Sequence, residues 1–268
     1  MERPVPILER LSAQALERAM VRMRDTSESE LFEKAELWKG RQGCFVEALQ
    51  RPGLSVIAEH KRRSPSKGLI REDWGVVETA TAYEWGGATA ISVLTEESRF
   101  GGSLGHLEKA REVTTLPLLR KDFITDSYQL LEAKAAGADA ALLIVGALET
   151  KKLHGLNSYA DSIGLDILME VHDLQELDRA IDVGPKAIGV NNRDLRHPEL
   201  KTDIRVTASL LSHVPEDMTT VTESGFGVDS KSRQFLHELH AHGVDAVLVG
   251  EALMRSDDPE AAVRYLSG

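Results

Sequence analysis

Eight short apolar segments recur along the chain with helical patterns between them, and this repeat restricts the possible folds more than any other feature. Several segments follow a glycine that ends the preceding helix, as in Gly137-Ala138-Asp139-Ala140 and Gly243-Val244-Asp245-Ala246. Alternating strands and helices joined by short turns form a parallel sheet. The expected strands are residues 54–60, 89–94, 116–122, 140–145, 166–171, 187–191, 219–223 and 245–249.

Eight such units predict an α/β fold in which the strands close into a (β/α)8 barrel, which typically takes about 250 residues. The 268 residues therefore suit a single domain spanning residues 1–268. An open, doubly wound sheet is the alternative arrangement of the same units. Helical spacing in residues 7–22 and a capping-box pattern at Ser27 and Glu30 predict extra N-terminal helices within residues 1–50, ahead of the repeat.

Charged side chains stand where the expected strands end, which in a barrel is the active face. Glu59 and Lys61 leave the first strand on one face, because alternate residues of a strand share a face. A single pair could be a structural ion pair, but an unpaired buried charge costs several kcal/mol, and such residues end five of the eight strands. Together they predict a polar catalytic pocket. The candidates are Glu59, Lys61, Lys121, Glu170, Asn191, Arg193 and Glu223.

Two glycine-containing loops predict an anion site. Barrels commonly bind phosphate between the loops after strands seven and eight and the N-terminus of a short helix. Here those loops read Glu223-Ser224-Gly225 and Val249-Gly250-Glu251, although glycines that serve only tight turns are the alternative interpretation. Ser64, in the basic loop after the first strand, is next to the last strand in a closed barrel and could reach the same anion.

Composition narrows the class of partner. A net charge of −11 without a long basic run argues against nucleic acid, so we expect a small-molecule partner. No run approaches the roughly 18 apolar residues of a membrane helix, and no membrane partner is expected. The single Cys44 excludes an intrachain disulfide and a multi-cysteine metal site, which favours a cytoplasmic protein. His237, His240 and His242 suit a helix C-terminus better than a metal site.

With these residues the chain resembles the indole-3-glycerol phosphate synthase family over roughly residues 45–255. The run Glu59-x-Lys61-x-x-Ser64-Pro65-Ser66 is specific to that family, whereas the glycine loops alone would fit many phosphate-binding barrels. The chain departs from the family pattern at His60, Arg63 and Asn192; His60 should face the helices, where only packing depends on it. The other matching segments are residues 92–97, 100–104, 119–123, 189–195 and 223–225.

The resemblance implies decarboxylative ring closure of 1-(2-carboxyphenylamino)-1-deoxyribulose 5-phosphate to indole-3-glycerol phosphate, CO2 and water, a step of tryptophan biosynthesis, with no metal or organic cofactor. It also implies that residues 1–50 lie over the barrel mouth. Lys121 would be the acid of the condensation, Lys61 would contact the substrate carboxylate or act in a second proton transfer, and Glu170 would be the base of the dehydration. The other implied contacts are Glu59 and Glu223 to the lysines and hydroxyls, Asn191 and Arg193 to the substrate, Pro65, Phe100, Phe123 and Leu195 to its ring, and Ser64, Ser224, Gly225, Gly250 and Glu251 around its phosphate.

Two other functions stay open at this point. One is a barrel that binds a sugar phosphate without turnover, and the other is a related enzyme such as phosphoribosylanthranilate isomerase. An isomerase of that kind would more typically use a Cys/Asp pair, and Cys44 precedes the first strand, away from the active face. Glu96 and Glu97, after the second strand, fit either a solvated loop pair or a role in substrate gating.

Overall fold

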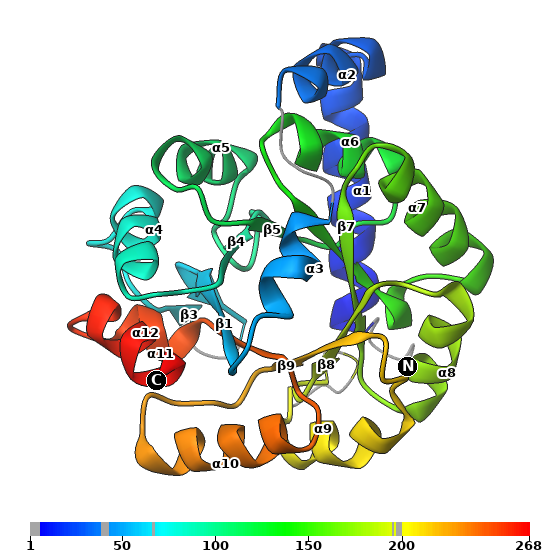
Figure 1. Ribbon diagram of the computed structural model, residues 1–268. Coiled ribbons are helices and arrows are strands. Elements are labelled where there is room, and N and C mark those ends of the chain that lie inside the picture. The colour runs from blue at the N-terminus through cyan, green and yellow to red at the C-terminus, as the bar shows by residue number, and fades with distance from the viewer. Residues whose placement is uncertain (1–5, 39–42, 66–67, 195, 197–199) are drawn as a thin grey trace, which may run out of the picture.

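Eight parallel strands close into a barrel in the order β1-β10-β9-β8-β7-β6-β5-β4 (Figure 1). The computed structural model describes residues 6–38, 43–65, 68–194, 196 and 200–268. Because β1 pairs with both β10 and β4, the sheet has no open edge, and the doubly wound alternative is wrong. Each expected segment contains one barrel strand: β1 Ser55–His60, β4 Ala90–Leu94, β5 Leu118–Lys121, β6 Ala140–Ile144, β7 Asp166–Val171, β8 Ala187–Asn191, β9 Thr219–Glu223 and β10 Ala246–Val249.

Alternation along the strands separates two apolar layers. Side chains such as Ile57, Leu119 and Leu168 fill the barrel interior, while their neighbours pack outward against the surrounding helices. His60 points outward as expected, with Nδ1 2.8 Å from Thr79 Oγ1. The surrounding helices are α4 Val76–Trp85, α5 Leu104–Val113, α6 Ser127–Ala135, α7 Thr150–Ser162, α8 Leu174–Val183, α9 Arg205–Leu210, α10 Ser230–Ala241, α11 Glu251–Arg255 and α12 Pro259–Ser267.

The short connections add 3-10 turns and a hairpin. The 3-10 turns η1 and η2 span Val145–Ala147 and Leu211–His213. After β1, strands β2 (Arg63–Ser64) and β3 (Gly68–Leu69) form a small antiparallel hairpin. In the described ranges, none of the helices combines the length and the apolar character needed to cross a bilayer.

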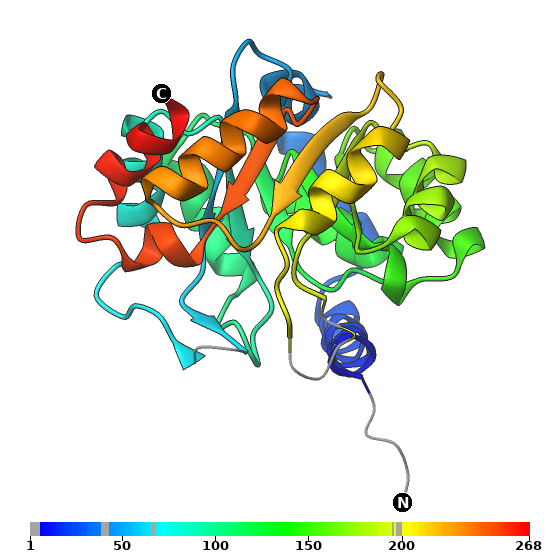
Figure 2. The same ribbon diagram turned by 90° about the horizontal axis from the view of Figure 1, so that it is seen from below.

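The N-terminal helices divide between the two ends of the barrel. Helix α1 (Ile7–Asp25) lies at the end where the strands finish, and its Leu8, Leu11 and Ala15 join the interior apolar cluster (Figure 2, dark blue). Helix α3 (Cys44–Leu49) lies at the opposite end, where Val46 N donates to Asp166 Oδ2 at 3.2 Å. Helix α2 (Glu28–Leu37) packs on α6 and begins with the expected capping box at Ser27.

Candidate active site

A cavity of about 540 Å³ opens at the C-terminal ends of the strands. Ser64 is buried in β2 and is not among the described residues that line the cavity, so its reach to the anion stays a prediction. Leu195 lies outside the described residues. The other residues expected in the site all line it: Glu59, Lys61, Pro65, Phe100, Lys121, Phe123, Glu170, Asn191, Arg193, Glu223, Ser224, Gly225, Gly250 and Glu251.

Ion pairs organise the floor of the cavity. Lys121 Nζ lies 3.0 Å from Glu170 Oε2 and 2.8 Å from Glu223 Oε2, so one ammonium joins the ends of three strands. Lys61 Nζ lies 2.5 Å from Glu59 Oε1. Glu59, Glu170 and Glu223 are buried, and each keeps one carboxylate oxygen without a hydrogen-bond partner among the described residues. At Glu59 and Glu223 the floor therefore presents acceptors that substrate hydroxyls or protons can engage, whereas the free Oε1 of Glu170 faces His172.

Burial and mutual charge set the protonation states of this group. Burial, with repulsion from Glu170, raises the pKa of Glu223 to about 7 although Lys121 opposes the rise. Burial also works against ionisation of Glu170, but Lys121 and His172 outweigh it and lower its pKa. Burial disfavours the Lys121 ammonium as well, and the surrounding carboxylates more than compensate and raise its pKa. Near neutral pH the site thus holds a charged lysine, an ionised Glu170 and a Glu223 that titrates.

The raised pKa of Glu223 predicts a pH-dependent stability difference. Because the folded pKa of about 7 exceeds the ordinary 4.5, the stability that Glu223 contributes is complete below pH 4.5 and is lost as the pH rises through 7. Glu223→Gln removes this titration. We expect the Tm of the variant minus that of the wild type to grow by about 5 °C between pH 5 and pH 8. Glu216→Gln, at an exposed position, serves as the control and should give a flat difference; a flat difference for Glu223→Gln would contradict the prediction.

Two glycines leave room for these carboxylates. A Cβ at Gly189 would stand 2.4 Å from Glu223 Oε1, and one at Gly250 would stand 2.3 Å from Glu59 Oε1. The φ of Gly250 is −122°, which any residue can adopt, so the requirement for glycine there is one of space. The sequence predicted that a ligand approaches the backbone at Gly250. The structure adds a second reason for glycine there, because a side chain would collide with Glu59.

The loop after β9 has a left-handed backbone. Ser224 and Gly225 have consecutive positive φ values of 67° and 97°, a conformation that favours glycine over residues with a side chain. A Cβ at Gly225 would approach Ile204 Cγ2 to 2.6 Å. Asn192, at a position where the chain departs from the family pattern, donates from Nδ2 to Ser224 O at 3.1 Å and so holds this loop.

Arg255 is a cation of the site that the sequence did not reveal. It lines the same end of the cavity as Gly250, and its Nε lies 3.2 Å from Glu251 Oε1. Arg255 stands one helical turn beyond Glu251, outside the two glycine-containing loops that indicated the anion site. The i,i+4 spacing of an acid and a base was the available signal.

The pairing with Arg255 predicts a small effect of removing the Glu251 carboxylate. Because that carboxylate is engaged by a side chain of its own helix, we expect Glu251→Ala to leave KM within a few-fold of the wild-type value. Steady-state kinetics would check this, with Arg255→Met as the matched variant that removes the cation instead. A KM raised more than tenfold by Glu251→Ala would give the carboxylate a direct binding role.

An apolar wall faces the charged floor. The rings of Phe100 and Phe123 lie with centroids 6.2 Å apart and planes inclined by 41°. Pro65 also lines the cavity. The sequence did not single out the remaining apolar lining, because these residues look like ordinary barrel interior. They are Leu94, Leu142, Ile144, Leu200, Phe226, Leu248, Val249 and Ala252.

His172 contacts Glu170 from outside the cavity and was not identified from the sequence either. Its Nε2 lies 3.4 Å from Glu170 Oε1, and its Nδ1 lies 3.0 Å from Glu176 Oε2. Burial opposes protonation of His172, but both carboxylates favour it and raise its pKa. Glu176 in turn pairs with Arg196 at 2.7 Å. The sequence offered only its i,i+2 spacing from Glu170, because His172 follows the end of β7 at Val171.

The histidines near the end of α10 have other partners. His240 Nδ1 lies 2.8 Å from Val244 O, and His242 Nδ1 lies 2.6 Å from Glu238 O. Within the part of the chain that the structure describes, no group of three or more His, Cys, Asp or Glu side chains could hold a metal ion.

Lysines and buried carboxylates gathered at the strand ends of a closed barrel define a (β/α)8-barrel enzyme. The family model described as indole-3-glycerol phosphate synthase matches residues 8–266. The chain belongs to the indole-3-glycerol phosphate synthase family.

Individual relatives agree with this assignment. The chain is 49% identical to indole-3-glycerol phosphate synthase 2 of Streptomyces coelicolor over 224 residues, an alignment that covers 84% of each protein. It is 48% identical over 209 residues, 78% of each protein, to indole-3-glycerol phosphate synthase of Burkholderia vietnamiensis. Among solved structures, thiamine phosphate pyrophosphorylase from Pyrococcus furiosus is similar with a TM-score of 0.59 and 19% identity, over 80% of this chain and 93% of that one, which shows a shared fold.

Proposed function

We propose that the chain catalyses the decarboxylative ring closure of 1-(2-carboxyphenylamino)-1-deoxyribulose 5-phosphate to indole-3-glycerol phosphate, CO2 and water. The observation that carries the proposal is the placement of Lys121 between Glu170 and Glu223, opposite the Phe100 and Phe123 wall, in a member of this family. The floor suits a reacting carbonyl and hydroxyls, and the wall suits an aromatic ring.

The condensation step needs an acid. The ring carbon that bears the carboxylate bonds to the ribulose carbonyl carbon, and the carbonyl oxygen becomes a hydroxyl by taking a proton from Lys121. The bond to the carboxylate then breaks, its electrons restore the aromatic ring, and CO2 leaves. Lys61, held by Glu59, contacts the substrate carboxylate before it departs or supplies a later proton.

The dehydration step needs both a base and an acid. Glu170, kept ionised by Lys121 and His172, takes a proton from the carbon next to the ring nitrogen. The hydroxyl formed in the first step leaves as water with a proton from a lysine. Glu223 holds Lys121 in place, and Asn191 and Arg193 orient the substrate.

The phosphate end of the substrate is assigned to the loops after β9 and β10. The backbone N–H groups of Ser224 and Gly225, in the left-handed loop after β9, would contact the anion. The N–H groups of Gly250 and Glu251, at the start of α11, would contact it from the neighbouring loop. Arg255 adds a positive charge at this end. We place the whole reaction in one cytoplasmic domain of residues 1–268, since α1 shares the apolar cluster of the barrel and the sequence holds a single cysteine.

The direct test is to incubate the purified protein with the carboxyphenylamino ribulose phosphate and follow indole fluorescence. We expect product to form at the same rate with EDTA present. Phosphate binding without product would favour a barrel that binds sugar phosphates without turnover. Loss of turnover in EDTA, restored by zinc or magnesium, would contradict cofactor-free chemistry. The isomerase alternative lacks support, because Cys44 lies in α3 at the far end of the barrel.

A further inference from the structure

Glu96 is a buried carboxylate that organises the loop between β4 and α5. Its side chain is 0% exposed, so the interpretation as a solvated loop residue is wrong for Glu96, whereas the neighbouring Glu97 is 52% exposed. Oε1 accepts from Ser98 N at 2.9 Å and from Ser98 Oγ at 2.6 Å. Oε2 accepts from Arg99 N at 2.7 Å and from Phe100 N at 3.1 Å. The loop folds around this one carboxylate.

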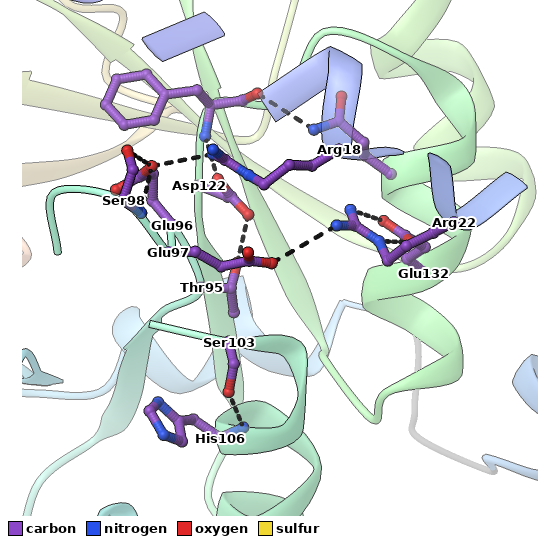
Figure 3. A network of polar contacts seen from close by, with 12 residues as sticks. Arg18, Arg22, Thr95, Glu96, Glu97, Ser98, Ser103, His106, Asp122 and Glu132 are labelled. Atoms are coloured by element: carbon purple, nitrogen blue, oxygen red, sulfur yellow. Dashed lines mark hydrogen bonds and ion pairs between the residues drawn. The ribbon is translucent and has the colours of Figure 1, made fainter. Parts of the chain in front are cut away.

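The loop carries part of the cavity wall and has little freedom. Phe100, whose N–H is bound by Glu96, lines the cavity, and its carbonyl oxygen accepts from Arg63 N at 3.2 Å. At one end, Thr95 Oγ1 donates to Asp122 Oδ2 at 2.5 Å; at the other, Ser103 caps α5 (Figure 3). A shift of Glu96 would therefore move the Phe100 ring relative to the charged floor.

Helix α1 contacts this carboxylate directly. Arg18 Nη2 lies 2.9 Å from Glu96 Oε1, across 78 positions of the sequence (Figure 3). Arg22, one turn later, pairs mainly with Glu132 of α6, with Nη2 2.9 Å from Oε2, and comes within only 3.8 Å of Glu97. The same helix thus has one arginine bound to the loop and another bound to the barrel scaffold.

We propose that Glu96 and Arg18 are positioning residues for the aromatic end of the substrate, and that helix α1 acts through them on the Phe100 wall. Arg18 compensates the charge of the buried carboxylate, and the carboxylate holds the amides that fix Phe100. Substrate binding depends on α1 through this contact. The inference rests on the proposed function, because the aromatic end of that substrate is what the wall would hold.

The test compares four variants. Arg18→Met should raise KM about tenfold with kcat within about threefold, since a hydrogen bond to a charged group is lost away from the reacting atoms. Arg18→Lys should recover most of the effect. Glu96→Gln should raise KM further, because its amide group would oppose backbone donors. Arg22→Met, the matched control on the same helix, should lower Tm and leave KM within about twofold.

A second readout does not depend on turnover. Hydrogen exchange of residues 96–103 should speed up at least tenfold in Arg18→Met and stay unchanged in Arg22→Met. An unchanged KM and unchanged exchange in Arg18→Met would overturn the proposal. An equal rise of KM in Arg22→Met would also overturn it, because α1 would then only stabilise the fold in general. A wild-type protein that forms no product would refute the proposed function instead, and the exchange result would still decide whether Arg18 positions the loop.

Discussion

Replacing Lys121 with Met should lower kcat by a factor of about 10²–10⁴, which is the usual range for a positioned acid or base, while KM changes only a few-fold. The reason is the placement of the ammonium between Glu170 and Glu223, where it is both protonated and close to the floor of the cavity. Met has a similar length and no proton to donate. Single-turnover kinetics would separate this loss in the chemical step from product release.

The control for Lys121→Met is Lys134→Met. Lys134 is also buried, and its Nζ donates to Gly164 O at 2.8 Å, but it lies outside the cavity. Lys134→Met should lower the stability of the protein and leave kcat near the wild-type value. If Lys121→Met kept near-normal kcat, the acid role would move to Lys61, which is the other ammonium of the floor.

The fold and the charged floor could be predicted because both follow from periodicity. Alternation of side chains along a strand puts Glu59 and Lys61 on one face, and closure of the barrel brings the strand ends together. The pairing within the floor could not be predicted. Lys121 lies 49 positions from Glu170 and 102 from Glu223, so the choice of partner depends on strand order, register and side-chain rotamers.

The roles of residues that act through another group could not be predicted from the sequence for a different reason. Glu96 fitted either a solvated acidic pair or a role in substrate gating, and its burial depends on the loop that folds around it and on Arg18 from a distant helix. His172 lies just after the strand that carries Glu170, but its link to Glu176 depends on the position of α8. The role of Ser64 stays a prediction, because the hairpin after β1 buries its side chain and only its motif suggested that it reaches the anion.

The second large effect is expected at Gly250. Gly250→Val should lower kcat/KM by a factor of about 10² or more, with losses in both parameters. A Cβ there would stand 2.3 Å from Glu59 Oε1 and 3.1 Å from Glu59 Cβ, so the carboxylate must move, and its 2.5 Å contact with Lys61 breaks. The same side chain would block approach of an anion to the backbone amides of α11. Gly155→Val, where a Cβ would meet nothing within 4 Å, is the matched control.

A double variant separates the two causes at Gly250. If the collision with Glu59 dominates, Gly250→Ala should cost little more activity once Glu59 has been changed to Ala, because the obstructing carboxylate is gone. If blocked access to the anion dominates, Gly250→Ala should raise KM by the same factor in both backgrounds, and inorganic phosphate should inhibit the variant less than the parent. Unchanged KM and kcat in Gly250→Val would refute both causes and place the phosphate elsewhere, because a valine that the site accommodates leaves neither the carboxylate displaced nor the amides covered.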